Sequence, residues 1–96
     1  MRTIRWHPVA RVELGDAAEY YARQRTGLGE IFVRAVYHAI DIIKQFPLAG
    51  RVVHPGYHRM VLHRFPYSLI YRVRVKYLEI IAVVPHLLDQ NNWIGR

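Results

Sequence analysis

The sequence contains no cysteine, which excludes disulfide bonds and thiolate chemistry and fits a reducing compartment. It also contains no run of about 18 apolar residues, so we expect no transmembrane helix and no membrane partner. The first residues lack the apolar stretch of a secretion signal. Together these absences predict a soluble, cytoplasmic protein.

Side chains suited to catalysis or metal binding are also scarce. Ser68 is the only serine, and no Gly-x-Ser-x-Gly turn surrounds it. Among the histidines, His54 and His58 have a helical spacing, but Pro55 and Gly56 between them disfavour a helix that would present both to one metal ion. We therefore predict no metal site, no cofactor and no serine nucleophile.

Acidic residues are few and unevenly distributed. The chain has 7 Asp and Glu against 14 Lys and Arg, a net charge of +7. The segment 51–76 holds six basic residues and no acid, and the rest of the chain contributes only one net positive charge. Such a field favours an anionic partner, whereas a solvated basic surface is the structural alternative.

Length and hydrophobic periodicity predict one domain over residues 1–96, with a helical hairpin near its start. Residues 2–6 resemble a short strand, and Pro8 suits the first turn of a helix that ends near Arg25. Residues 28–46 carry the clearest amphipathic pattern, and the short connection between the two helices indicates an antiparallel pair.

The second half of the chain has the pattern of strands. Residues 48–57 read as a loop, and apolar or β-branched runs follow at 59–65, 67–75 and 78–84. The order β-αα-βββ predicts an α+β fold in which an antiparallel sheet packs against the N-terminal helical hairpin. We expect one face of the middle strand to meet the second helix, through the following residues: Leu69, Tyr71 and Val73 against Phe32, Val36, Ile40 and Ile43.

These segments resemble the ParE/RelE superfamily of toxins from type II toxin–antitoxin pairs. The resemblance covers nearly the whole chain and rests on an ordered set of short motifs: Glu13-Leu14, Ala17-Ala18-Glu19-Tyr20-Tyr21, Gly27-Leu-Gly29, Arg64-Phe65-Pro66-Tyr67, Ile70-Tyr71-Arg72, Ile80-Ile-Ala-Val83 and Trp93. It implies a partner antitoxin and a cellular target, which is the ribosome with its mRNA in the RelE branch and DNA gyrase in the ParE branch.

The sequence departs from the ribonuclease branch at positions that this branch uses. Ser68 stands where an arginine is common, Pro85 where a histidine is common, and Leu87 and Leu88 where two basic residues are common. His86 replaces that histidine only after a shift of one residue. We therefore expect a ParE-like gyrase inhibitor with no catalytic residues.

We expect the target and an acidic C-terminal segment of the antitoxin to be bound by basic residues and a C-terminal aromatic residue: Arg59, Arg64, Arg72, Arg74, Trp93 and Arg96. Trp93 could instead only cover the edge of the sheet. The enzymatic alternative is a metal-independent mRNA endoribonuclease that uses Arg59, Arg64, Arg72 and His86. A third hypothesis is a small nucleic-acid-binding domain, based on the basic segment 51–76.

Overall fold

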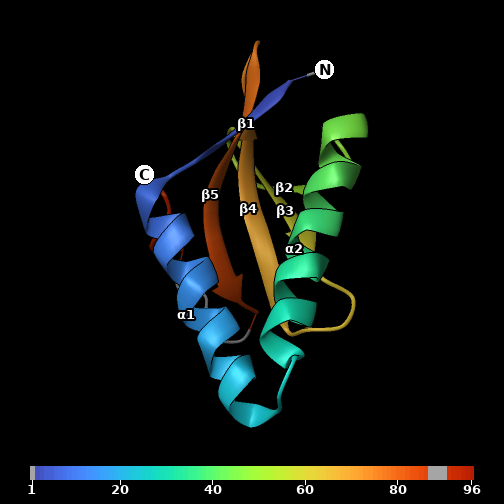
Figure 1. The fold of residues 1–96 in the computed structure, drawn as a ribbon. Helices are drawn as coiled ribbons and strands as arrows, with labels where there is room; N and C mark the ends of the chain where they lie inside the picture. Colours follow the sequence, from blue (N-terminus) through green and yellow to red (C-terminus); the bar gives the residue numbers. More distant parts are fainter. Residues whose placement is uncertain (1, 87–90) are drawn as a thin grey trace.

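The computed structural model describes residues 2–86 and 91–96. Its elements follow in this order: β1 (Thr3–Trp6), α1 (Pro8–Gln24), α2 (Leu28–Gln45), β2 (Arg51–His54), β3 (Tyr57–Val61), β4 (Tyr67–Val73) and β5 (Tyr77–Pro85). Figure 1 shows the two helices lying antiparallel on one side of the sheet. The predicted α+β fold and its N-terminal helical hairpin are confirmed.

Local sequence explains where the two helices begin and end. Pro8 occupies the first turn of α1, where its missing N–H costs nothing, and the Nδ1 atom of His7 accepts a hydrogen bond from the backbone N–H of Val9 at 3.1 Å. Gly27 adopts φ 85° at the start of α2, a conformation that lets the chain reverse direction. At the other end Phe46 caps α2 directly before Pro47, which cannot continue a helix.

The sheet is mixed, with strand order β1-β5-β4-β3-β2. The strands β3, β4 and β5 pair antiparallel as predicted, and β2 adds a fourth antiparallel strand at the edge. By contrast, β1 pairs parallel with β5. Parallel neighbours need a long connection, and here the helical hairpin and three strands separate the two partners along the chain. Residues from the two ends of the sequence therefore lie side by side.

The prediction of a loop over residues 48–57 is wrong for Arg51–His54, because these residues form the edge strand β2, which pairs with β3. Gly50 precedes this strand, and Pro55 and Gly56 make the tight turn after it, with Gly56 at φ 81°. These turn residues dominate the local pattern, although the four residues between them favour an extended chain. As a consequence β3 occupies 57–61 and ends earlier than the predicted 59–65.

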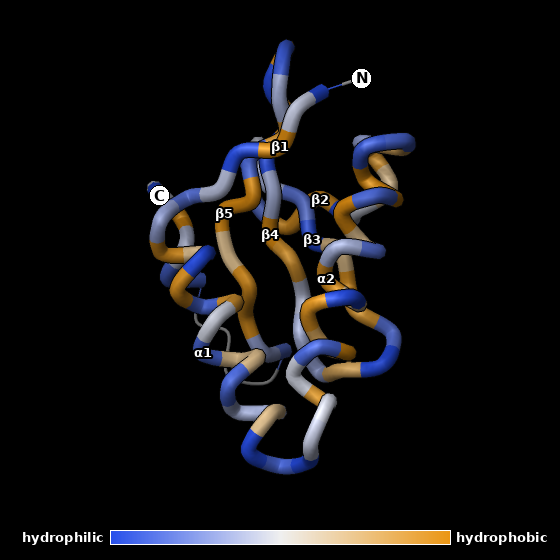
Figure 2. The backbone as a smooth tube through the Cα atoms, in the orientation of Figure 1, coloured by the Kyte–Doolittle hydropathy of each residue, from blue (hydrophilic) through white to orange (hydrophobic). Residues whose placement is uncertain are grey.

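The main core lies between the helices and the sheet. Phe32, Val36, Ile40 and Ile43 from α2 belong to one buried cluster with Leu69 and Tyr71 of β4, and the partly buried Val73 packs against it. The expected helix–strand packing is therefore confirmed. Figure 2 shows the hydrophobic colour concentrated along β4 and β5, which are the central strands.

A second, smaller apolar cluster covers the face of the sheet that points away from the helices, which we call the helix-distal face. Its buried members come from three strands and the C-terminal segment: Tyr57, Ile70, Ile81, Ala82, Val84 and Trp93. The register shifts between Ile70 and Tyr71, because β5 carries one extra residue there. This bulge places neighbouring residues of β5 on the same face, so the helix-distal face is more apolar than strict alternation would make it.

Neither helix in the described part of the chain combines the length and the hydropathy needed to span a bilayer.

Candidate functional site

Two of the expected binding residues lie on the helix-distal face. The guanidinium of Arg72 stands 4.6 Å from the ring centroid of Tyr57. On the neighbouring strand, Nη1 of Arg59 donates a hydrogen bond to Oγ of Ser68 at 3.2 Å. Ser68 is completely buried, so its hydroxyl supports an arginine and is not accessible as a nucleophile. The face thus presents positive charge on positioned side chains.

Trp93 packs as a core residue and does not stand on the surface. Its side chain is 1% exposed, and its ring centroid lies 5.1 Å from that of Tyr57. The backbone N–H of Gly95 donates to the Tyr57 hydroxyl at 3.1 Å, which holds the segment after Trp93 against the same strand. Trp93 therefore covers the apolar helix-distal face, close to the alternative expectation that it covers the edge of the sheet, and its role in binding a target stays a prediction.

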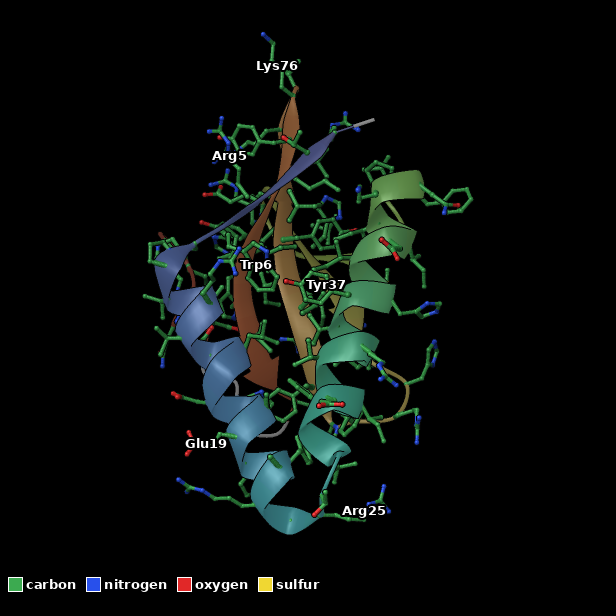
Figure 3. All side chains as sticks on the ribbon, viewed as in Figure 1. Arg5, Trp6, Glu19, Arg25, Tyr37 and Lys76 are labelled. Atoms are coloured by element: carbon green, nitrogen blue, oxygen red, sulfur yellow. The ribbon has the colours of Figure 1, made fainter. Side chains whose placement is uncertain are left out.

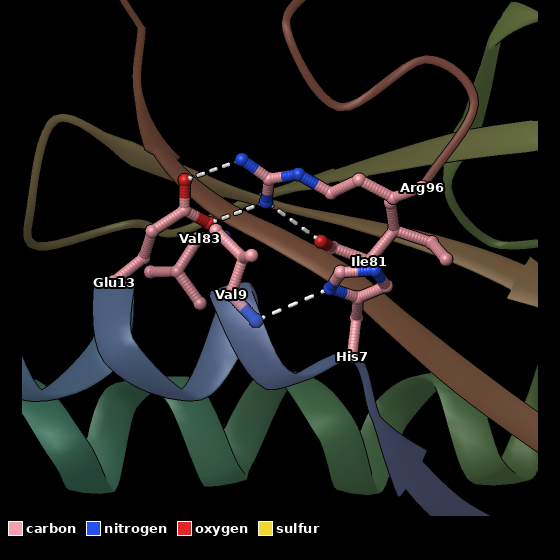
Figure 4. A network of polar contacts seen from close by, with 6 residues as sticks. All are labelled: His7, Val9, Glu13, Ile81, Val83 and Arg96. Atoms are coloured by element: carbon pink, nitrogen blue, oxygen red, sulfur yellow. Dashed lines mark hydrogen bonds and ion pairs between the residues drawn. The ribbon is translucent and has the colours of Figure 1, made fainter.

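Arg96 is held inside the molecule as well. Its Nη1 and Nη2 atoms donate to the two carboxylate oxygens of Glu13 at 2.8 and 3.0 Å, and Nη1 also donates to the carbonyl of Ile81 at 2.9 Å (Figure 4). Glu13 further accepts from the backbone N–H of Val83 at 3.1 Å. This half-buried pair joins the C-terminus to α1 and β5, so Arg96 offers little free charge to a partner. Nothing in the sequence indicated Glu13 as its partner.

Arg74 lies at the other end of β4, in the turn before β5. Its Nη2 atom is 3.5 Å from the carboxylate of Glu79, and its carbonyl accepts a hydrogen bond from Nε of Arg2 at 2.7 Å. Val75, the next residue, is 89% exposed and belongs to the turn. The predicted strand 67–75 therefore ends two residues early, at Val73.

Arg64 faces a groove between α2 and the segment 60–64, which is the end of β3 and the start of the loop after it. The groove has a volume of about 400 Å³ and is lined mainly by apolar residues of both elements, among them Ala35, Ala39, Met60 and Leu62. Exposed basic or titratable residues also line it, and sequence reasoning found only the first of them: Arg64, Arg34, His38 and His63. An apolar floor with a cationic rim suits an amphipathic, acidic helix.

The residues of the ribonuclease alternative come from three regions of the structure. Arg59 and Arg72 are on the helix-distal face, Arg64 is in the groove beside α2, and His86 follows β5, where its backbone N–H donates to the carbonyl of Pro66 at 2.9 Å. Arg72 of β4 pairs with Glu79, and Tyr67 of β4 pairs with Pro85 at the end of β5. Five residues of β4, roughly 16 Å of strand, therefore separate Arg72 from the end of β5.

Two further expectations concern metal ions and the segment before Trp93. Within residues 2–86 and 91–96, no group of three or more His, Asp or Glu side chains is placed to hold a metal ion. Leu87, Leu88 and the beginning of the 89–96 segment lie outside the described residues.

The fold of a helical hairpin packed on a mixed five-stranded sheet occurs in a known structure. One solved structure with this fold is the chromosomal ParDE toxin–antitoxin system from P. aeruginosa, with a TM-score of 0.64, 23% sequence identity, and coverage of 88% of this chain and 96% of that chain. At this identity the likeness concerns the fold.

Sequence comparison adds the family. The model of the ParE toxin of the type II toxin–antitoxin system, parDE, matches residues 4–87, and the chain belongs to this family. No curated protein matches the chain. The chain is thus a toxin of the type II toxin–antitoxin class, as the resemblance implied.

Proposed function

We propose that this toxin inhibits DNA gyrase and that a cognate antitoxin with an acidic C-terminal segment neutralises it. The observation that carries the proposal is membership of the ParE family over residues 4–87. Arg72 lies roughly 16 Å along the strand from the end of β5, which His86 follows. This separation supports a target other than mRNA, because cleavage of RNA needs a base, an acid and a stabilising cation around one phosphate.

The groove beside α2 is the surface that we assign to the antitoxin. Its apolar lining offers burial to an amphipathic helix, and apolar burial supplies most of the affinity in such complexes. Arg34 and Arg64 are exposed at this groove, and they attract acidic side chains that flank the apolar stripe of the incoming helix. An acidic segment that folds on contact would fit both properties.

The target is tested by assaying purified gyrase with the toxin, alone and after addition of the antitoxin encoded by the neighbouring gene. We expect loss of supercoiling and accumulation of cleaved DNA, both reversed by the antitoxin. Transcript ends are mapped in parallel in cells that express the toxin. Codon-positioned cuts in mRNA with normal supercoiling would refute gyrase inhibition and make His86 the first residue to mutate.

The antitoxin site is tested by reversing one charge at the groove. Arg64→Glu places a negative charge beside the acidic segment, and we expect the complex to dissociate about tenfold or more faster, an effect of roughly 1.4 kcal/mol. Arg25→Glu is the matched control, because Arg25 is also exposed but lies just after α1, away from the groove. Equal dissociation rates for the two variants would place the antitoxin elsewhere.

A further inference from the structure

Four basic residues from distant parts of the sequence gather at one end of the molecule, and we call them the β1-end cluster: Arg2, Arg5, Arg74 and Lys76. The parallel pairing of β1 with β5 brings them together. The backbone N–H of Thr3 donates to the carbonyl of Lys76 at 3.3 Å, next to the bond from Arg2 to the Arg74 carbonyl. Figure 3 shows Arg5 and Lys76 at this end, while Glu19 and Arg25 lie at the opposite end.

An aromatic ring holds one of these guanidinium groups in place, and another ring holds the guanidinium of Arg11 in α1. The Arg5 guanidinium lies 4.2 Å from the ring centroid of Tyr77, and the Arg11 guanidinium lies 5.2 Å from that of Trp6. The Trp6 ring in turn packs beside Tyr37, with 6.1 Å between the centroids. Cation–π contacts position the charges without neutralising them, so the guanidinium N–H groups remain available to an anionic ligand.

Little negative charge offsets the cluster. The pairing of β1 with β5 places Glu79 opposite Arg5. A carboxylate oxygen of Glu79 lies 3.5 Å from Nη2 of Arg74. Arg5 and Lys76 are both exposed. The well-formed grooves of the described residues lie elsewhere, so this end offers positive charge without a pocket for an apolar anchor.

We propose that the β1-end cluster binds the phosphate backbone of double-stranded nucleic acid, independently of its sequence. Guanidinium groups match phosphate oxygens in two-point contacts, and a duplex supplies one charge per roughly 1.7 Å of its axis. Tyr77 and Trp6 each carry a guanidinium over the ring, which disfavours stacking on unpaired bases and leaves the backbone as the ligand. A protein partner would require buried apolar anchors in addition to charge.

This site lies beyond the proposed gyrase inhibition, because the toxin alone should bind the duplex. The experiment measures the fluorescence anisotropy of a short labelled DNA duplex, with the full chain, at salt concentrations between about 50 and 200 mM. The test variant is Arg5→Gln with Lys76→Gln, and the control is Arg23→Gln with Arg25→Gln. Each removes two exposed charges, and the control lies at the other end of the molecule.

We expect the test variant to bind about tenfold more weakly at low salt, and its plot of log K against log salt to be shallower by about two. The control should stay within about twofold of the unmodified chain, since only its long-range charge changes. Arg5→Lys with Lys76→Arg keeps both charges and should keep the slope. Two duplexes of unrelated sequence should bind equally well.

Three results would overturn the proposal: equal losses in the test and control variants, no duplex binding by the unmodified chain, or tighter binding to polyglutamate than to DNA. The last would assign the cluster to an acidic protein surface. Circular dichroism of each variant establishes that it is folded. If the chain inhibits gyrase without binding duplex DNA by itself, this proposal fails and the proposed function stands.

Discussion

Truncation of Trp93 to alanine would remove most of the cover of the helix-distal face. The side chain is 1% exposed and packs in a cluster with Tyr57, Ile70, Ile81 and Val84. Replacement of a buried tryptophan by alanine costs about 3–5 kcal/mol, through lost burial and the cavity that remains. At about 0.05–0.15 kcal/mol per residue, a domain of this size has about 5–14 kcal/mol of stability in total. Trp93→Ala should therefore remove at least a fifth of it.

Urea unfolding, followed by circular dichroism, measures this loss. The slope of the unfolding free energy against urea concentration reports the surface that unfolding exposes. This slope should stay the same, because the substitution is expected to change the stability and not the exposed surface. Ile94→Ala is the matched control in the same segment. Ile94 is 43% exposed, so its truncation should cost about 1 kcal/mol or less.

A loss below about 1 kcal/mol for Trp93→Ala would refute the reasoning, because such values belong to exposed sites. The C-terminal segment would then not cover the sheet in solution, and Trp93 would regain its expected role as a target-binding residue. A large loss, by contrast, would mean that any effect of Trp93→Ala on toxicity must first be corrected for the unfolded fraction.

Four further changes probe the core, α1 and the turn before β2. Ile40→Ala should cost about 2–5 kcal/mol in urea unfolding, and a near-neutral value would mean that α2 faces elsewhere. Gly50→Ala should destabilise by about 1–3 kcal/mol, because its Cβ would meet the Tyr71 hydroxyl at 2.7 Å and the Arg59 carbonyl at 2.8 Å. Gly15→Ala, with open space around its Cβ, should instead stabilise α1 by roughly 0.5–1 kcal/mol, and equal effects of the two glycine changes would contradict this packing. Burial raises the pKa of Tyr71 above 10.0, so its neutral form stabilises the fold below that pH, and this contribution is lost as the pH rises through the raised pKa. Urea midpoints of the unmodified chain should therefore fall above about pH 10, and Tyr71→Phe should fall less steeply; parallel curves would show that Tyr71 is not responsible.

Tyr71 also shows how far one side chain can be anticipated. Its place on the apolar face of a strand follows from alternation, and it is buried as expected. Its hydroxyl donates to the carbonyl of Pro47 at 2.7 Å and accepts from the N–H of Gly50 at 2.9 Å. Those partners lie more than twenty residues away, and no local pattern identifies them.

The sequence by itself determined the helical hairpin, the apolar faces that meet in the main core and the resemblance to the toxin family. These features depend on spacing of 3.6 or 2 residues and on short ordered motifs, which neighbouring residues define. They required no knowledge of which distant segments meet. For the same reason Ile40 was assigned correctly to the core, whereas the residues between Gly50 and Pro55 were assigned to a loop.

Tertiary structure alone decided which ends of the chain meet. The sequence placed most of the net positive charge in residues 51–76, but parallel pairing of β1 with β5 adds Arg2 and Arg5 to the turn that holds Arg74 and Lys76. It also buried Trp93, because the face of a sheet that two helices leave open must be covered by some other apolar group. The first outcome depends on contacts between residues about 70 positions apart, and the second on contacts between residues more than 20 positions apart. The local periodicity of the sequence does not encode the free energy of such contacts.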